Sequence, residues 1–135
     1  MGRILGLDWG TVRIGVALSD ESGTIAQAYA GKPIKQNRSV AVKLRKLVGE
    51  YDVARIVIGL PKQVGGTEGA SAYAVRAFGS TLKESLKLPI EYEDERFTTV
   101  QANKENQTSS NIVDNQAARV MLQQYLDRNK SHAHA

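Results

Sequence analysis

Ile4-Leu5-Gly6-Leu7-Asp8-Trp9-Gly10-Thr11 is the stretch that decides the fold. Alternation predicts a strand with Leu5 and Leu7 on one face and Gly6 and Asp8 on the other. A carboxylate at the end of a buried strand is costly unless a cation, a base or a hydrogen-bond donor neutralises it. Gly6 leaves space beside Asp8 that would suit a cation or a phosphate. Asp8 is therefore either a ligand for such a group or a turn residue that caps its own loop.

Length and composition predict one globular domain over residues 1–128 and a disordered tail over residues 129–135. The chain has 135 residues, of which 41% are hydrophobic and 24% charged, and its net charge of +4 is a mild hint of an anionic partner. No apolar run approaches the roughly 18 residues that span a bilayer. We expect a cytoplasmic protein without a membrane segment. Cysteine is absent, and both histidines lie in the predicted tail, so a metal would be held by oxygen.

The residues after the opening strand predict an antiparallel meander and then a basic helix. Val12–Ser19 alternates as a second strand, a turn follows, and Thr24–Ala30 predicts a third strand. The charges from Lys32 to Lys46 are all positive, and the second half of this run has the periodicity of a helix. Its lysines, Lys43 and Lys46 among them, form either a solvated helix face or a surface that contacts phosphates.

The rest of the chain predicts alternating strands and helices. Residues 55–61 read as a central strand covered on both faces, and a helix follows whose apolar stripe is Val75, Phe78, Leu82 and Leu86, with Thr67 or Ser71 as its cap. The remaining predicted elements are a strand over 90–96, a short helix from Phe97, a loop over 103–111 and a last helix over Val113–Asp127. The predicted fold is α/β, with a mixed five-stranded sheet, in which an antiparallel three-strand meander joins parallel strands, flanked by helices.

Acidic residues in the second half of the chain are candidate partners for Asp8. Asp94 and Glu95 end the predicted strand 90–96, and alternation puts them on opposite faces. Asp114 lies at the start of the last helix, on its apolar stripe, where it either serves a site or favours the helix dipole. Three oxygen ligands suit Mg²⁺ or Mn²⁺. Two such ions about 4 Å apart can activate water against a phosphodiester, so metal-dependent hydrolysis of nucleic acid is the reaction that we expect.

Motifs along nearly the whole chain resemble those of the YqgF/RuvX family. They are Leu7-Asp8-Trp9-Gly10-Thr11-Val12-Arg13-Ile14-Gly15-Val16-Ala17, Val57-Ile58-Gly59-Leu60-Pro61, Gly66-Thr67-Glu68-Gly69, Asp94-Glu95-Arg96-Phe97-Thr98-Thr99, Val113-Asp114-Asn115-Gln116-Ala117-Ala118 and Tyr125-Leu126-Asp127. The resemblance implies a ribonuclease H-like fold in a cytoplasmic bacterial protein. It also implies a Holliday junction resolvase, or a nuclease that trims the 5′ end of pre-16S ribosomal RNA. The catalytic and metal-binding set that it implies is Asp8, Glu95 and Asp114.

These expectations define a candidate nuclease site and its alternatives. Asp8 would bridge two ions, Glu95 and Asp114 would each complete one ion's shell, and Asp94 is held in reserve. The expected partner is structured RNA or a four-way DNA junction, and pairing of two copies into a homodimer stays open. The alternatives are a single-lobe nucleotide-binding protein, since the opening motif also resembles the first phosphate loop of actin and the sugar kinases, and a non-catalytic nucleic-acid-binding module. The candidate nucleic-acid-binding residues are Thr11, Arg13, Lys43, Lys46, Lys62 and Arg96.

Overall fold

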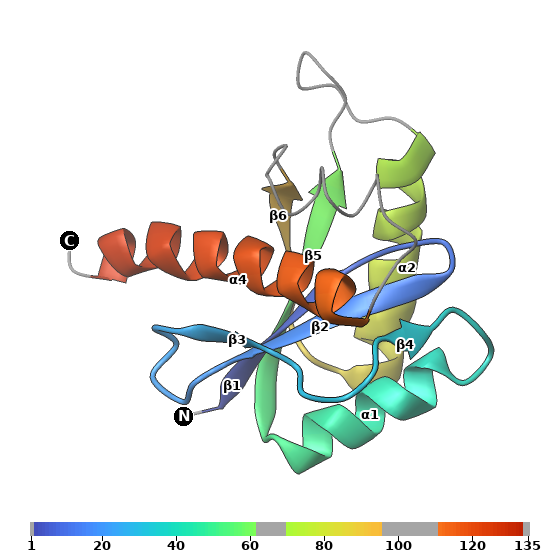
Figure 1. Ribbon diagram of the computed structural model, residues 1–135, viewed down its shortest axis with the longest axis horizontal. Coiled ribbons are helices and arrows are strands. Elements are labelled where there is room, and N and C mark those ends of the chain that lie inside the picture. Colours follow the sequence, from blue (N-terminus) through green and yellow to red (C-terminus); the bar gives the residue numbers. More distant parts are fainter. Residues whose placement is uncertain (1, 62–69, 96–110, 134–135) are drawn as a thin grey trace.

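The computed structural model describes residues 2–61, 70–95 and 111–133 (Figure 1). The strands are β1 (Arg3–Asp8), β2 (Arg13–Ser19), β3 (Ala26–Ala28), β4 (Ile34–Lys35), β5 (Val53–Pro61) and β6 (Ile90–Glu95). The helices are α1 (Val40–Glu50), α2 (Ala70–Leu86) and α4 (Asn111–Ala133). Five of the six strands and all three of these helices therefore overlap the elements that the sequence patterns predict at similar positions.

The strands form a mixed sheet in the order β3-β2-β1-β5-β6, and the short β4 pairs with β2 off this path. β1, β2 and β3 make the predicted antiparallel meander, whereas β5 and β6 run parallel to β1. The mixed sheet is confirmed, but the prediction of five strands missed β4. Because β1, β5 and β6 are parallel, their carboxyl ends meet at one end of the sheet. Asp8 and Glu95 are the last residues of β1 and β6 at that end.

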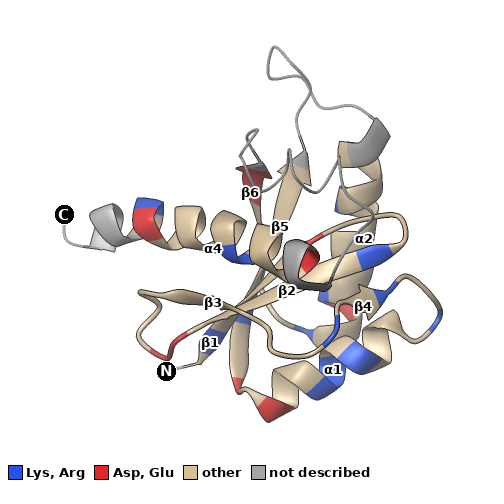
Figure 2. Cartoon of the chain, viewed as in Figure 1, with Lys and Arg blue, Asp and Glu red and all other residues tan. Residues whose placement is uncertain are grey.

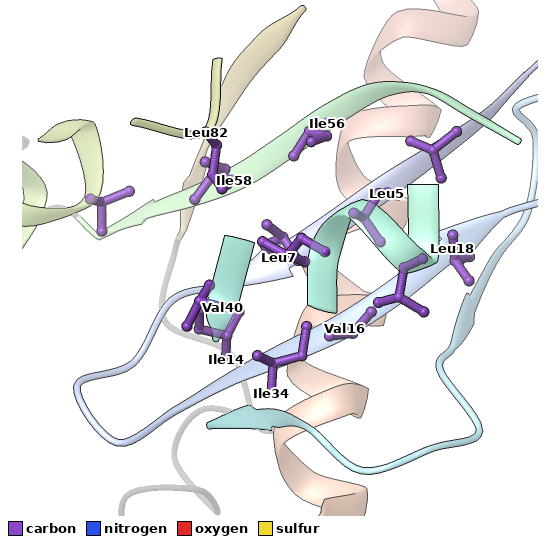
Figure 3. Close-up of a cluster of buried hydrophobic side chains, with 14 of the residues drawn as sticks. Leu5, Leu7, Ile14, Val16, Leu18, Ile34, Val40, Ile56, Ile58 and Leu82 are labelled. Carbon is purple, nitrogen blue, oxygen red and sulfur yellow. The ribbon is translucent and has the colours of Figure 1, made fainter. Parts of the chain in front are cut away.

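Helices cover both faces of the sheet. The face that we call the α1/α2 face carries a core in which Leu7, Ile14 and Ile58 pack with residues of α1 and α2 (Figure 3). The opposite face, the α4 face, carries a smaller cluster in which Val57 packs with α4 residues such as Leu122. β5 is thus apolar on both sides because helices bury both sides, as its sequence predicts. Figure 1 shows α4 crossing the strands of the sheet.

The third strand is shorter than predicted. Thr24–Ala30 reads as a strand in the sequence, but β3 covers only Ala26–Ala28. The backbone N–H groups of Thr24 and Ile25 donate to Oδ1 of Asp20, at 2.8 and 3.0 Å, instead of joining the sheet. A hydrogen bond from the Ser22 hydroxyl, and after it these two backbone bonds, lower the pKa of Asp20 to about 2. The turn therefore takes residues that the alternation alone assigns to the strand.

The helix boundaries also differ from the prediction. α4 runs from Asn111 to Ala133 and not from Val113 to Asp127, so the first five residues of the predicted tail are helical. Arg128 in this extension hydrogen-bonds Glu93 of β6, which anchors the helix beyond its predicted end. α2 begins at Ala70, so Ser71 lies inside the helix and does not cap it. Among the described helices, α4 included, none combines the length and the apolar character that a membrane crossing needs.

Several predictions fall outside the described residues. They concern the proposed cap Thr67, the short helix from Phe97 and the loop from residue 103 to 110. Asn111, which the sequence assigns to the end of that loop, is the first residue of α4. The last helix therefore begins earlier than the sequence patterns indicate.

Candidate active site

Asp8 lies at the carboxyl end of β1 and is buried, with 3% of its surface exposed. It stands opposite Gly15 of β2 in the antiparallel register. Alternation along β1 puts Asp8 on the α4 face with Gly6, and a Cβ atom at Gly6 would lie 2.9 Å from Cβ of Leu122 in α4. Asp8 therefore ends a strand beneath the last helix.

The space beside Gly6 serves packing and not a ligand. The sequence suggested that this glycine leaves room for a cation or a phosphate next to Asp8. Leu122 fills that room, and its Cβ, Cγ and Cδ2 atoms all lie within 3.3 Å of the position that a Cβ at Gly6 would take. This interpretation of Gly6 is wrong, because the missing side chain lets α4 approach the sheet closely.

Asp114 lies in the first turn of α4 and is also 3% exposed. The prediction that it faces the sheet is confirmed by this burial and by the backbone contact at Gly15. A Cβ atom at Gly15 would lie 2.0 Å from the carbonyl oxygen of Asp114. Asp8 and Asp114 therefore flank the same glycine, one as its partner in the sheet and the other above it on the helix.

Arg13 is the charged partner of Asp114 in the structure. Its Nε donates to Oδ2 of Asp114 at 2.7 Å, across 101 residues of sequence. The side chain of Arg13 is 26% exposed and that of Asp114 only 4%. A charge-assisted hydrogen bond of this length holds the carboxylate in one orientation. Sequence reasoning gave Arg13 a role toward phosphates and did not foresee this ion pair.

The register of β6 distinguishes Asp94 from Glu95. Asp94 stands opposite Leu60, whose side chain belongs to the core of the α1/α2 face, so Asp94 takes the face away from Asp8. Position 95 stands opposite Pro61, one step further along β6. The register thus argues against Asp94 as the third acid, and Glu95 stays the predicted one.

A hollow of about 660 Å³ lies at the outer edge of the sheet and includes the reserve acid. Asp94 lines it together with Tyr92, Asp127 and Arg128. The hydrogen bond from Arg128 to Glu93 raises the pKa of the arginine. This hollow is formed by β6 and the end of α4, whereas Asp8 and Asp114 lie at β1 and the start of α4. The volume of this hollow is therefore no guide to where Asp8 and Asp114 lie.

Asn115 fixes the start of α4 on the sheet. Its Oδ1 accepts a hydrogen bond from the N–H of Val16 at 2.9 Å. Its Nδ2 donates to the carbonyl oxygens of Tyr29 and Gly31, at 3.0 and 2.9 Å. The residue next to Asp114 thus ties the helix to β2 and to the segment after β3. Sequence reasoning missed it, although a polar residue beside a buried acid in a helix was a signal.

A second polar cluster fixes the other half of α4. The Tyr125 hydroxyl donates to Oε2 of Glu91 at 3.0 Å and accepts from Nη1 of Arg55 at 3.1 Å. Burial raises the pKa of Tyr125, which therefore stays protonated in this network. Hydrogen bonds thus hold α4 on the sheet both at its start and in its second half.

Replacing Asn115 by alanine is expected to lower the free energy of unfolding by about 3 kcal/mol. The change leaves the N–H of Val16 and two carbonyl oxygens without their partner, at about 1 kcal/mol for each lost bond. Urea unfolding measures the loss. The control is Gln116→Ala on the same turn, which removes one bond from Arg119 and is expected to cost about 1 kcal/mol or less. Equal losses in the two variants would contradict this role of Asn115.

The donor set fits a divalent cation such as Mg²⁺ or Mn²⁺. Asp8 and Asp114 are buried carboxylic acids whose backbones both adjoin Gly15, and oxygen is the ligand that these ions prefer. Within the parts of the chain that the structure describes, no three acids or histidines are grouped closely enough to hold a metal. The third predicted ligand, Glu95, has a described backbone but no described side chain. The described side chains therefore include two of the three predicted ligands.

The predicted nucleic-acid-binding residues are dispersed around this centre. Thr11 is exposed in the turn before β2. Lys43 and Lys46 are exposed on α1, beyond the sheet from α4. Lys62 and Arg96 lie outside the described residues. The structure thus brings Arg13 to the acids and places the two α1 lysines elsewhere.

The comparisons with known proteins agree on one family and one fold. A family model described as "RuvX: Holliday junction resolvase" matches residues 2–128. A Streptococcus thermophilus protein named "Putative pre-16S rRNA nuclease" is 40% identical over 93% of this chain and 98% of its own length. A protein of the same name from Thermoanaerobacter pseudethanolicus is 39% identical over 96% of this chain and 99% of its own.

Two solved structures that resemble the chain contain Holliday junction DNA. Thermus thermophilus RuvC, solved with a Holliday junction substrate, has a TM-score of 0.58 and 13% identity, over 97% of both chains. The Fowlpox virus resolvase, solved with Holliday junction DNA, has a TM-score of 0.57 and 11% identity, over 93% of this chain and 97% of its own. At such low identity these matches establish the ribonuclease H-like fold and nothing further.

Proposed function

Because the chain belongs to the RuvX family, we propose that it is a divalent-metal-dependent nuclease that hydrolyses phosphodiester bonds in structured nucleic acid. One observation carries the proposal: Asp8 and Asp114 are both buried, and both flank Gly15 at the carboxyl end of the parallel strands. Buried carboxylates held together are costly unless a cation compensates their charge. Arg13 already compensates part of the charge of Asp114, and a divalent cation would add to that compensation.

The proposed ligands are Asp8, Asp114 and Glu95. Divalent ions bound there would supply the activated water and the stabilisation of the leaving oxygen that phosphodiester hydrolysis needs. Arg13 keeps the Asp114 carboxylate oriented through its bond to Oδ2. The partial exposure of its side chain also leaves cationic surface at the rim of the site. Asn115 and the Tyr125 cluster keep the helix, and with it Asp114, at a fixed distance from the sheet.

The first substrate that we propose is the precursor of 16S ribosomal RNA. The support is the name of the relatives that are about 40% identical to nearly all of the chain. The second is a four-way DNA junction, supported by the description of the family. Symmetric cleavage of a junction would in addition require two copies of the chain, which gel filtration measures.

Cleavage assays with and without metal test this proposal. The purified protein is incubated with a labelled RNA that spans the 5′ end of the 16S precursor, and separately with a four-way DNA junction. We expect cleavage of one of them in Mg²⁺ or Mn²⁺, loss of cleavage in EDTA and recovery when excess Mg²⁺ is added. A linear DNA duplex of the same length is the control.

Two outcomes would contradict the proposal. Cleavage that continues unchanged in EDTA would exclude the role of the metal. Tight binding of both substrates without cleavage at any metal concentration would identify a non-catalytic nucleic-acid-binding module instead.

A further inference from the structure

Two adjoining hollows lie between the start of α4 and α1. The first, of about 280 Å³, is lined by the segment from Ala28 to Lys32 and by Asn115 and Gln116 of α4. The second, of about 410 Å³, continues between the segment from Lys32 to Lys35 and α1. Tyr29 and Lys32 line both hollows. Together they form one groove, which we call the basic groove.

The charge of this groove is strongly positive. The second hollow is lined by Lys32 and Lys35 on one side and by Lys43 and Lys46 on the other, against one acid, Glu50. Within the described part of the chain, none of these four ammonium groups lies within ion-pair distance of a carboxylate. Figure 2 shows basic residues along α1 and beside β4. The like charges of these lysines repel one another across the hollow, so their electrostatic energy is unfavourable. An anion bound between them would make that electrostatic energy favourable.

The basic groove begins at the candidate active site. Asn115, next to Asp114, holds the carbonyl oxygens of Tyr29 and Gly31, so the wall of the groove is bonded to the site. Lys35 stands opposite Arg13 in the pairing of β4 with β2, and Arg13 binds Asp114. The basic groove therefore adjoins the start of α4, where Asp114 lies, and extends from there to α1.

We propose that the basic groove binds the sugar-phosphate backbone of a strand that flanks the scissile bond. This inference rests on the proposed nuclease function, and it says where the substrate strand lies beyond the acids. The groove has cations on both walls and the aromatic ring of Tyr29 where its two halves join, a combination that suits a nucleic-acid strand. Because Asn115, the neighbour of Asp114, lines one end of the groove and α1 lines the other, a long strand fits it better than a separate small anion. DNA and RNA both carry this phosphate backbone, so contacts with phosphates alone do not distinguish the two.

The salt dependence of binding tests the inference. The double variant Lys32→Gln/Lys46→Gln removes one charge from each wall. It is made in an Asp8→Asn background, which keeps the substrate intact, and binding of the labelled junction and of the labelled RNA is measured by fluorescence anisotropy over a range of KCl. We expect about tenfold weaker binding at low salt and, for the DNA junction, a slope of log K against log salt that is smaller by about two.

The matched control is Lys83→Gln/Lys87→Gln, which removes the same charge from exposed positions near the end of α2. We expect this variant to keep the slope of its parent. The inference is overturned if the groove variant keeps the parental slope, or if the control loses as much. A fall in the slope for RNA alone, or for DNA alone, would support the groove and identify the natural ligand.

The failure of this inference is distinguishable from failure of the proposed function. Cleavage by the wild-type chain decides the function, whereas the slope compares two variants in one background and requires no cleavage. A second measurement shortens one arm of the substrate in steps. We expect shortening to weaken binding by the Asp8→Asn parent and to have little effect on the groove variant, whose arm contacts are already lost. If shortening the arm weakens binding by both proteins equally, the basic groove does not bind the flanking strand.

Discussion

Replacing Asp8 by asparagine is expected to lower kcat for nucleic-acid cleavage by about a thousandfold or more, a loss typical of removing a central catalytic group. The change keeps the shape of the side chain and removes the charge that would hold a divalent cation. Because Asp8 is 3% exposed beside Gly15, water cannot easily take over its role as a ligand. The measurement is single-turnover cleavage of the preferred substrate in Mg²⁺, compared with the wild-type chain.

The fold is expected to survive this change. Asparagine fits the same space, and the removal of a charge from a buried site that also contains Asp114 relieves repulsion. We expect the free energy of unfolding to change by about 1 kcal/mol or less. The control is Asp52→Asn, at the opposite end of the parallel strands, where φ is 53° and asparagine tolerates the left-handed backbone. If Asp8→Asn cleaves as fast as this control, Asp8 is not a metal ligand.

The sequence predicted those parts of the fold that depend on local patterns. Alternation in residues 3–19 gave β1 and β2 with the correct faces, because one side of each strand meets the large core. The apolar run of β5 indicated a strand buried on both sides, which α2 and α4 confirm. Asp114 was placed toward the sheet by helical periodicity alone. Each of these signals lies within one element, so no knowledge of distant partners was needed.

The features that the sequence missed depend on partners far along the chain. β4 has two residues, too few for any periodicity, and exists because Ile34 and Lys35 pair with β2. The bonds of Asn115 span 84 to 99 residues. The same holds for the ion pair of Arg13 with Asp114. Gly6 was assigned to a ligand because the sequence could not show that Leu122 occupies its side of the strand.

Gly15 is the second position where one substitution is expected to have a large effect. A Cβ atom there would lie 2.0 Å from the carbonyl oxygen of Asp114 and 2.7 Å from its carbonyl carbon. Both atoms are backbone, so no side-chain rotation relieves the clash, and the start of α4 must move. We expect Gly15→Ala to lower the free energy of unfolding by about 3 kcal/mol, as strong overpacking does.

The displacement of α4 by Gly15→Ala is also expected to separate Asp114 from Asp8. A shift of about 1 Å in a catalytic group can cost about a hundredfold in rate, so we expect at least that loss of cleavage, measured under conditions in which urea unfolding shows the variant to be folded. Gly49→Ala is the matched control, because a Cβ at Gly49 in α1 meets nothing within 4 Å. It should raise the free energy of unfolding by about 0.5 kcal/mol and leave cleavage unchanged. A Gly15→Ala variant as stable and active as Gly49→Ala would show that the close contact of α4 with β2 does not determine the position of Asp114.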